Sequence, residues 1–109
     1  MITYADWNIE AMTGYIPKTT FYMDFSIADM HGGIPAIKDT FKRAFNAWKT
    51  NIEYITELAM ALNWKSWEHD SRGNHEICEL YIELYYKLDG YITSTFKGDD
   101  LMYYYRTTD

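Results

Sequence analysis

The stretch from Asn51 to Trp67 places the strongest constraint on the fold, because it predicts one helix with two apolar sides. The first stripe repeats at spacings of three and four residues and consists of Ile52, Ile55, Leu58, Ala59 and Leu62. The second stripe lies on a different side and consists of Met60, Trp64 and Trp67. We expect the first stripe to face a core, and the C-terminal segment or another subunit to cover the second.

Two amphipathic helices on either side of this stretch should supply that core. The first starts near Gly33, and its apolar positions are Ile34, Ile37, Phe41, Ala44, Phe45 and Trp48. The second follows a turn at Ser71 to Asn74, and its stripe is Ile77, Leu80, Tyr81, Leu84, Leu88, Tyr91, Ile92 and Phe96. Thr50 or Asn51 is the predicted N-cap of the central helix, and Asn74 is the predicted N-cap of the helix that follows the turn. Ion pairs are expected for Asp39 with Arg43 and for Glu83 with Lys87, each four residues apart.

Three segments are less clearly patterned. Tyr4 to Met12 is predicted to form a short helix. In Thr20 to His31, apolar residues alternate as in a strand, whereas the flanking Thr20 and Gly32 favour a helix, which we prefer. Residues 91–96 and 101–107 are rich in β-favouring side chains, so a terminal hairpin is the alternative to a helix there.

The predicted fold is therefore mainly all-α. We expect a single domain, residues 1–109, in which about four principal helices pack as an antiparallel bundle, with a short N-terminal element and a Tyr-rich C-terminal tail. An α+β domain with a small terminal hairpin is the alternative. Gly90 interrupts the last long stripe, but the stripe resumes in register, so a continuous or mildly kinked helix is expected, with Gly90 admitting a close neighbour.

Charge and cysteine content limit the classes of function. The 109-residue chain carries a net charge of −6, which opposes attraction to nucleic-acid phosphates and to anionic membranes. Its single cysteine, Cys78, excludes an internal disulfide and fits a reducing compartment. No apolar run is long enough to cross a bilayer, and the first residues lack the pattern of a signal peptide. These features predict a cytoplasmic protein.

Groups able to carry chemistry are few. His69, His75 and Cys78 form a weak candidate metal site, because His75 and Cys78 lie three residues apart on one predicted helix. Structural zinc sites normally bring paired ligands from two segments, and this chain has one cysteine. No nucleophile motif and no glycine-rich phosphate loop is present. The sequence therefore predicts no cofactor, no metal and no enzyme activity.

A basic helix face gives a second candidate site. Lys38, Lys42, Arg43 and Lys49 lie in an otherwise acidic chain. The preceding turn is similar to that of a helix-turn-helix, but Lys38 occupies a position that such a motif needs to be apolar. A solvated helix face is the preferred interpretation, and the overall acidity argues against nucleic acid.

An aromatic surface is the third candidate. Aromatic residues make up 18% of the chain, and three consecutive tyrosines cannot all point into one core, so at least one should reach the surface. Exposed Trp, Tyr and Arg are typical of protein contacts. The predicted partner-binding residues are Met60, Trp64, Trp67, Tyr103, Tyr104, Tyr105 and Arg106.

The stretch FYMDFSIADMHGGIPAIKDTFKRAFNAWKTNIEYITELAMALNWKSW and the ending YYYRTTD carry a family resemblance. Over most of its length the chain resembles small uncharacterised proteins encoded by phages and conjugative elements of gut-type Gram-positive bacteria. The resemblance implies an accessory protein of a mobile element that binds a host or element-encoded partner, and it transfers no functional residue.

These observations favour a non-enzymatic protein-protein interaction module that forms a homodimer through its aromatic surface. The alternative is a nucleic-acid-associated regulator that uses the basic helix at residues 34–49, or an acidic nucleic-acid mimic that inhibits a host enzyme. A small metalloenzyme ranks third.

Overall fold

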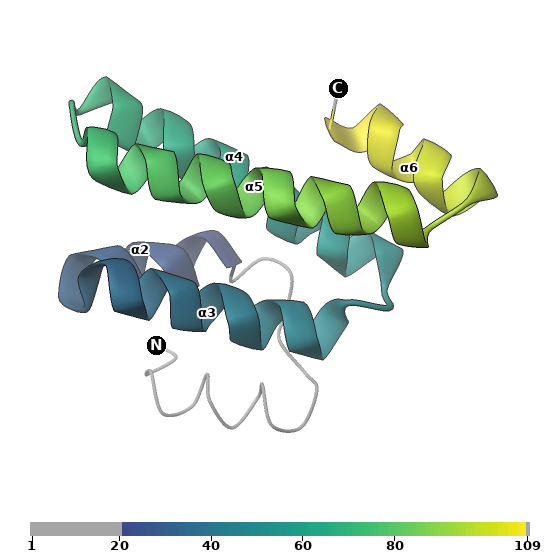
Figure 1. Ribbon diagram of the computed structural model, residues 1–109, viewed down its shortest axis with the longest axis horizontal. Coiled ribbons are helices and arrows are strands. Elements are labelled where there is room, and N and C mark those ends of the chain that lie inside the picture. The colour runs from purple at the N-terminus through teal and green to yellow at the C-terminus, as the bar shows by residue number, and fades with distance from the viewer. Residues whose placement is uncertain (1–20, 109) are drawn as a thin grey trace.

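The computed structural model describes residues 21–108, and every regular element in that range is a helix. The five helices are α2 (Phe21–His31), α3 (Gly33–Trp48), α4 (Ile52–Ser71), α5 (His75–Thr95) and α6 (Gly98–Thr108). Consecutive helices reverse direction through short connections (Figure 1). The all-α prediction is confirmed, and the terminal hairpin is wrong because residues 98–108 form a helix. The helix predicted for Tyr4 to Met12 lies outside the described residues.

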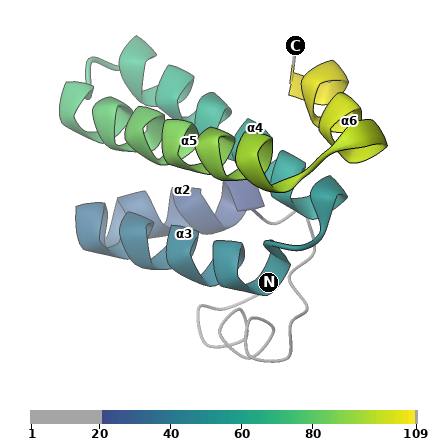
Figure 2. The same cartoon turned by 45° about the vertical axis from the view of Figure 1, so that its right-hand side comes forward.

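Helix α4 is the centre of the molecule, since it packs against each of the other four helices. The first predicted stripe forms the core, and its members Ile55, Leu58, Ala59 and Leu62 are fully buried. Figure 2 shows α4 and α5 side by side above the pair formed by α2 and α3. Within residues 21–108 no helix has both the length and the apolar character needed to span a membrane.

Helix α2 resolves the ambiguity at residues 20–31 in favour of the helix. Phe21, Phe25 and Ala28 are buried at helical spacing, whereas Met23, which the strand pattern would place beside Phe25, is exposed. The ring of Phe25 packs edge-on against Tyr81, with ring centroids 5.6 Å apart. The turn into α3 requires a glycine, because a Cβ on Gly32 would lie 2.3 Å from the Cβ of Ala36.

Both ends of α4 have clear local causes. Asn51 caps the start as predicted, and its side-chain oxygen accepts a hydrogen bond from the Tyr54 backbone N–H at 3.1 Å. At the other end Gly73 adopts φ +77°, and the N–H groups of Gly73 and Asn74 donate to the Asp70 and His69 carbonyls at 3.0 and 2.9 Å. This is a Schellman ending, which satisfies the last carbonyls of the helix.

Asn74 occupies the N-cap position of α5, as predicted, but its side chain makes no capping hydrogen bond there. Its amide nitrogen instead lies 3.2 Å from Nδ1 of His69, in the helix before. The side chain therefore joins the end of α4 rather than the start of α5.

Helix α5 continues through Gly90 without a break, as predicted. The expectation that Gly90 admits a close neighbour is wrong, because no neighbouring atom outside the helix lies within 4 Å of a Cβ placed there. Helix α6 then returns along α4 and is anchored by Tyr104. The Tyr104 side chain is buried, and its hydroxyl donates to Oδ1 of Asp89 at 2.6 Å.

We predict that Gly90→Ala stabilises the protein by up to about 1 kcal/mol, because alanine is the better helix former and meets free space at this position. Gly73→Ala is the matched comparison and should destabilise the protein, because its positive φ strains any residue with a Cβ. Urea unfolding followed by circular dichroism measures both. A Gly90→Ala variant less stable than the parent would contradict the prediction.

Candidate functional site

The second predicted stripe of α4 forms an exposed apolar surface, which we call the tryptophan face and define as Met60, Trp64 and Trp67. The two indole side chains are 60% and 70% exposed, and Met60 is 39% exposed. The α4 pattern explains this exposure, because the opposite stripe is the side that packs on α2, α3 and α5. An apolar face of this kind is normally covered in a functional assembly.

Two hollows flank the tryptophan face, and both indoles line each of them. One, of about 490 Å³, continues onto Glu68, Asp70 and Ser71 at the end of α4. The other, of about 140 Å³, lies between α4, Tyr85 of α5 and the last residues of α6. The tail therefore reaches the edge of the tryptophan face but leaves the indoles in solvent.

The tyrosine run divides as helical geometry requires. Tyr104 points into the molecule and is buried, whereas Tyr105 is 42% exposed and Tyr103 is partly exposed. Arg106 is exposed. The prediction that at least one tyrosine reaches the surface is confirmed, but Tyr104 is not available to a partner, because its side chain packs within its own chain.

Sequence reasoning missed a buried polar network between α2, α4 and α5. At its centre the side chain of Lys65 is only 2% exposed. Its ammonium group donates to Oγ of Ser26 at 3.0 Å and to Glu68, and it forms an ion pair with Oδ2 of Asp29 at 3.1 Å. These three oxygen partners compensate the buried positive charge.

Asp29 joins the three helices through one carboxylate. Oδ2 of Asp29 forms the ion pair with Lys65, and it accepts hydrogen bonds from the Tyr81 hydroxyl at 3.0 Å and from Nε2 of His69 at 2.8 Å. Because the Asn74 amide nitrogen can only donate, Nδ1 of His69 is assigned as the acceptor and Nε2 as the nitrogen that donates to Asp29. Both ring nitrogens of His69 are thus engaged inside the molecule.

The network shifts the pKa of two groups. Burial raises the pKa of Tyr81 strongly, and the negative charge of Asp29 adds to the effect, so Tyr81 stays a donor at neutral pH. Burial alone would also raise the pKa of Glu68, but hydrogen bonds from Lys65 and Tyr22 outweigh it and the pKa is lowered. Glu68 is therefore held as a carboxylate beside the ammonium group.

One signal could have revealed this network. Leu58, Leu62, Lys65 and His69 follow one another at spacings of four, three and four, so the last two continue the core stripe. In α2, Phe21, Phe25 and Asp29 repeat at four. The core stripe of α4 thus ends in Lys65 and His69, and the core stripe of α2 ends in Asp29. The prediction did not use this pattern because Lys and Asp are seldom buried.

The candidate metal site is not assembled. Within residues 21–108 no group of three or more His, Cys, Asp or Glu side chains is placed to hold a metal ion. His69 is buried and bound to Asp29, His75 is exposed, and the Cys78 thiol is buried. Burial raises the pKa of Cys78, and the charges of Asp70 and Glu79 raise it further, which opposes the thiolate form needed for metal binding.

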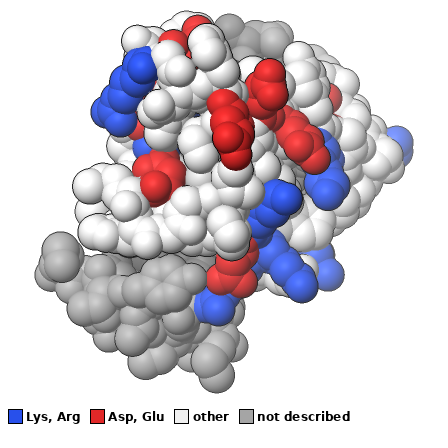
Figure 3. Space-filling model, turned by 60° about the vertical axis from the view of Figure 1, so that its left-hand side comes forward, with Lys and Arg blue, Asp and Glu red and all other residues white. Residues whose placement is uncertain are grey.

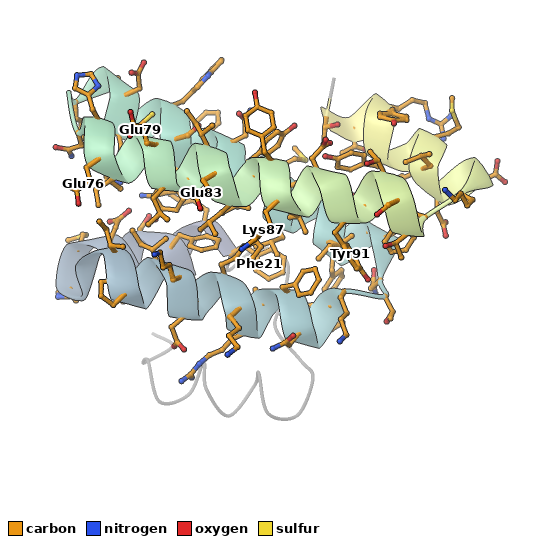
Figure 4. The ribbon with its side chains drawn as sticks, in the orientation of Figure 1. Phe21, Glu76, Glu79, Glu83, Lys87 and Tyr91 are labelled. Carbon is orange, nitrogen blue, oxygen red and sulfur yellow. The ribbon has the colours of Figure 1, made fainter. Side chains whose placement is uncertain are left out.

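The basic residues of α3 do not act as one stripe. Arg43 pairs with Asp39 at 2.9 Å, as predicted, and Lys49 lies beyond the end of the helix. Lys38 and Lys42 instead line a groove that α3 shares with α5. The predicted pair of Glu83 and Lys87 is absent from the ion pairs of the described residues. Both side chains line the groove, and Figure 4 shows Lys87 on the side of α5 that faces α3.

We predict that Lys65→Met lowers the free energy of unfolding by about 3–5 kcal/mol, because it leaves the buried Asp29 carboxylate without its cation. Adding Asp29→Asn should cost less than the sum of the single changes, with a coupling energy of roughly 0.5–3 kcal/mol. Urea unfolding of the parent, the two single variants and the double variant measures this coupling energy. The exposed pair Asp39 and Arg43 is the control, with an expected coupling of about 0.3–0.5 kcal/mol. Additive losses at Lys65 and Asp29 would contradict the prediction.

Glu68 should also make the free energy of unfolding depend on pH in the acidic range. Its pKa in the folded protein lies below the ordinary value of 4.5, so its contribution is present above pH 4.5 and is lost as the pH falls through the lowered pKa. We predict that Glu68→Gln removes this part of the acid dependence in unfolding curves recorded above and below pH 4.5. Glu79→Gln, a change at an exposed position of α5, should keep it. Parallel curves for the Glu68→Gln variant and the parent would refute the assignment.

Comparison with known proteins adds no functional assignment. No protein-family model matches the chain, and neither curated proteins nor solved structures include a significant match.

Proposed function

We propose that this protein is a non-enzymatic interaction module that forms a homodimer through the tryptophan face. The observation that carries the proposal is the exposure of Trp64 and Trp67, one turn apart on the central helix. Tryptophan contributes a large apolar area and is enriched among the residues that dominate binding energy at interfaces. Both indoles are held on a well-packed helix, so little conformational entropy is lost when they are covered.

The position of the face favours pairing with a second copy. The tryptophan face lies along a single helix, α4, so a two-fold axis across it would set the same residues of both copies against each other. The hollows beside Trp64 and Trp67 would receive side chains of the partner copy. Tyr105 and Arg106 on α6 are also exposed, and they precede Thr107 and Thr108, which line the smaller hollow.

The polar residues support an interaction role over catalysis. Lys65 and His69, the groups most suited to acid-base chemistry, are buried and use their polar atoms within the network. The expected setting of an accessory protein from a phage or mobile element is part of the same proposal, since a small interaction module suits such a role.

We predict a concentration-dependent monomer-dimer equilibrium in sedimentation velocity, and a Trp64→Ser/Trp67→Ser variant that stays monomeric. The substituted side chains are largely exposed, so the fold and its circular dichroism should be retained. On dilution of the parent, tryptophan fluorescence should shift to longer wavelength as indoles enter water, and the variant should lack this shift.

Met30→Ser is the matched control, because Met30 is 75% exposed on α2 and lines neither hollow. This variant should dimerise like the parent. A parent protein that remains monomeric at the highest accessible concentration would refute the proposal, as would a Trp64→Ser/Trp67→Ser variant that dimerises normally.

A further inference from the structure

A second surface, separate from the tryptophan face, lies between α3 and α5. These two helices form a groove of about 570 Å³. Its buried floor is made by Phe41, Leu80, Leu84 and Leu88, and its partly exposed apolar side chains are Phe45 and Tyr91. None of the residues that line it lines the hollows beside Trp64 and Trp67. Figure 4 shows Lys87 and Tyr91 on the side of α5 that faces α3, with Phe21 of α2 in the space behind.

Aromatic contacts join α3 and α5 near the C-terminal ends of both helices. The ring of Phe45 packs edge-on against Tyr91 at a centroid distance of 4.7 Å, and the Tyr91 hydroxyl donates to the Lys49 carbonyl at 2.7 Å. Phe41, which is buried, stacks on Phe45 with centroids 6.0 Å apart and forms part of the floor of the groove. The base of the groove is therefore ordered before any ligand binds.

Three lysines edge this apolar base. Lys38 and Lys42 extend from α3 and Lys87 from α5, and all three are exposed. Among the ion pairs of the described residues none involves these lysines, and Glu83 is the one acidic residue among those that line the groove. In the view of Figure 3, Lys and Arg side chains gather beside a group of acidic ones on the surface.

We propose that this groove binds one amphipathic helix of a partner protein, with its apolar face on the aromatic base and its acidic residues paired with Lys38, Lys42 and Lys87. The length fits, since Leu80 to Tyr91 on α5 spans about 16 Å, or three helical turns. Helix-in-groove recognition uses such an apolar channel between two helices.

The lysines determine the charge of the partner. Their ammonium groups stand on both edges, so a helix with acidic residues on both sides of its apolar stripe would complement them. The rest of the chain is acidic, with a net charge of −6 overall, so an acidic helix would be repelled elsewhere and directed to this groove. A basic helix would meet like charge at both edges.

The test uses two synthetic amphipathic peptides of about four turns, or roughly 14 residues, with identical leucine stripes. In the first peptide all positions outside the leucine stripe are glutamate, and in the second peptide they are lysine. Fluorescence anisotropy of the labelled peptides should show that the glutamate peptide binds at least about tenfold more tightly. Its affinity should fall as salt increases, because exposed ion pairs are screened.

Charge reversal locates the site. Lys42→Glu/Lys87→Glu should weaken binding of the glutamate peptide about tenfold or more. Arg72→Glu/Lys97→Glu changes the net charge equally at positions that do not line the groove, and it should alter binding by less than about twofold. Binding should persist in the Trp64→Ser/Trp67→Ser variant, so this result is independent of dimerisation. Absent binding, equal binding of both peptides, or equal losses in the two charge-reversed variants would overturn the proposal.

Discussion

The structure depends on the burial of one positive charge. Lys65 lies in the interior where three helices meet, and taking an ammonium group out of water costs several kcal/mol unless its donors are matched. The oxygen atoms that compensate this charge come from Asp29 and Ser26 of α2 and from Glu68 of α4 itself. Because these acceptors must lie at fixed positions around Nζ, the network sets how α2 crosses α4 more strictly than apolar contacts alone would. Tyr81 and His69 extend the same constraint to α5 and to the turn that follows α4.

Much of the fold could be predicted from the sequence, because most elements have consistent local signals. In α3 the apolar period, the early proline and the pair of Asp39 with Arg43 all indicate one helix, and the structure has it. The Asn51 cap and the glycine turn at Gly73 gave the limits of α4 to within a few residues. The ambiguous stretch was α2, where Phe21, Met23, Phe25 and Ile27 alternate. Only packing against Tyr81 and α4 separates the two interpretations there, and packing is not visible in a local pattern.

The surfaces were predictable only in part. The tryptophan face follows from helical spacing, because Met60, Trp64 and Trp67 cannot share the side of α4 that holds Ile55 and Leu62. The Lys65 network was not anticipated, since a lysine in a helix is ordinarily assigned to solvent and its acceptor Asp29 lies 36 positions away along the chain. The groove was missed for a related reason. The sequence predicts Lys42 on a solvated helix face and Lys87 in an ion pair with Glu83, and only the parallel course of α3 and α5 brings the two lysines to one groove.

The alternating direction of the helices has a consequence for the order of folding. The pairs α2 with α3 and α4 with α5 are hairpins of neighbouring helices, and their contacts close short loops, which can form within microseconds to milliseconds. The bonds from Asp29 to Lys65 and Tyr81 instead join one hairpin to the other. They complete only when the hairpins dock, after most local contacts exist. The ionic network is thus expected to act on the lifetime of the folded state, since interactions absent from the transition state slow unfolding more than they speed folding.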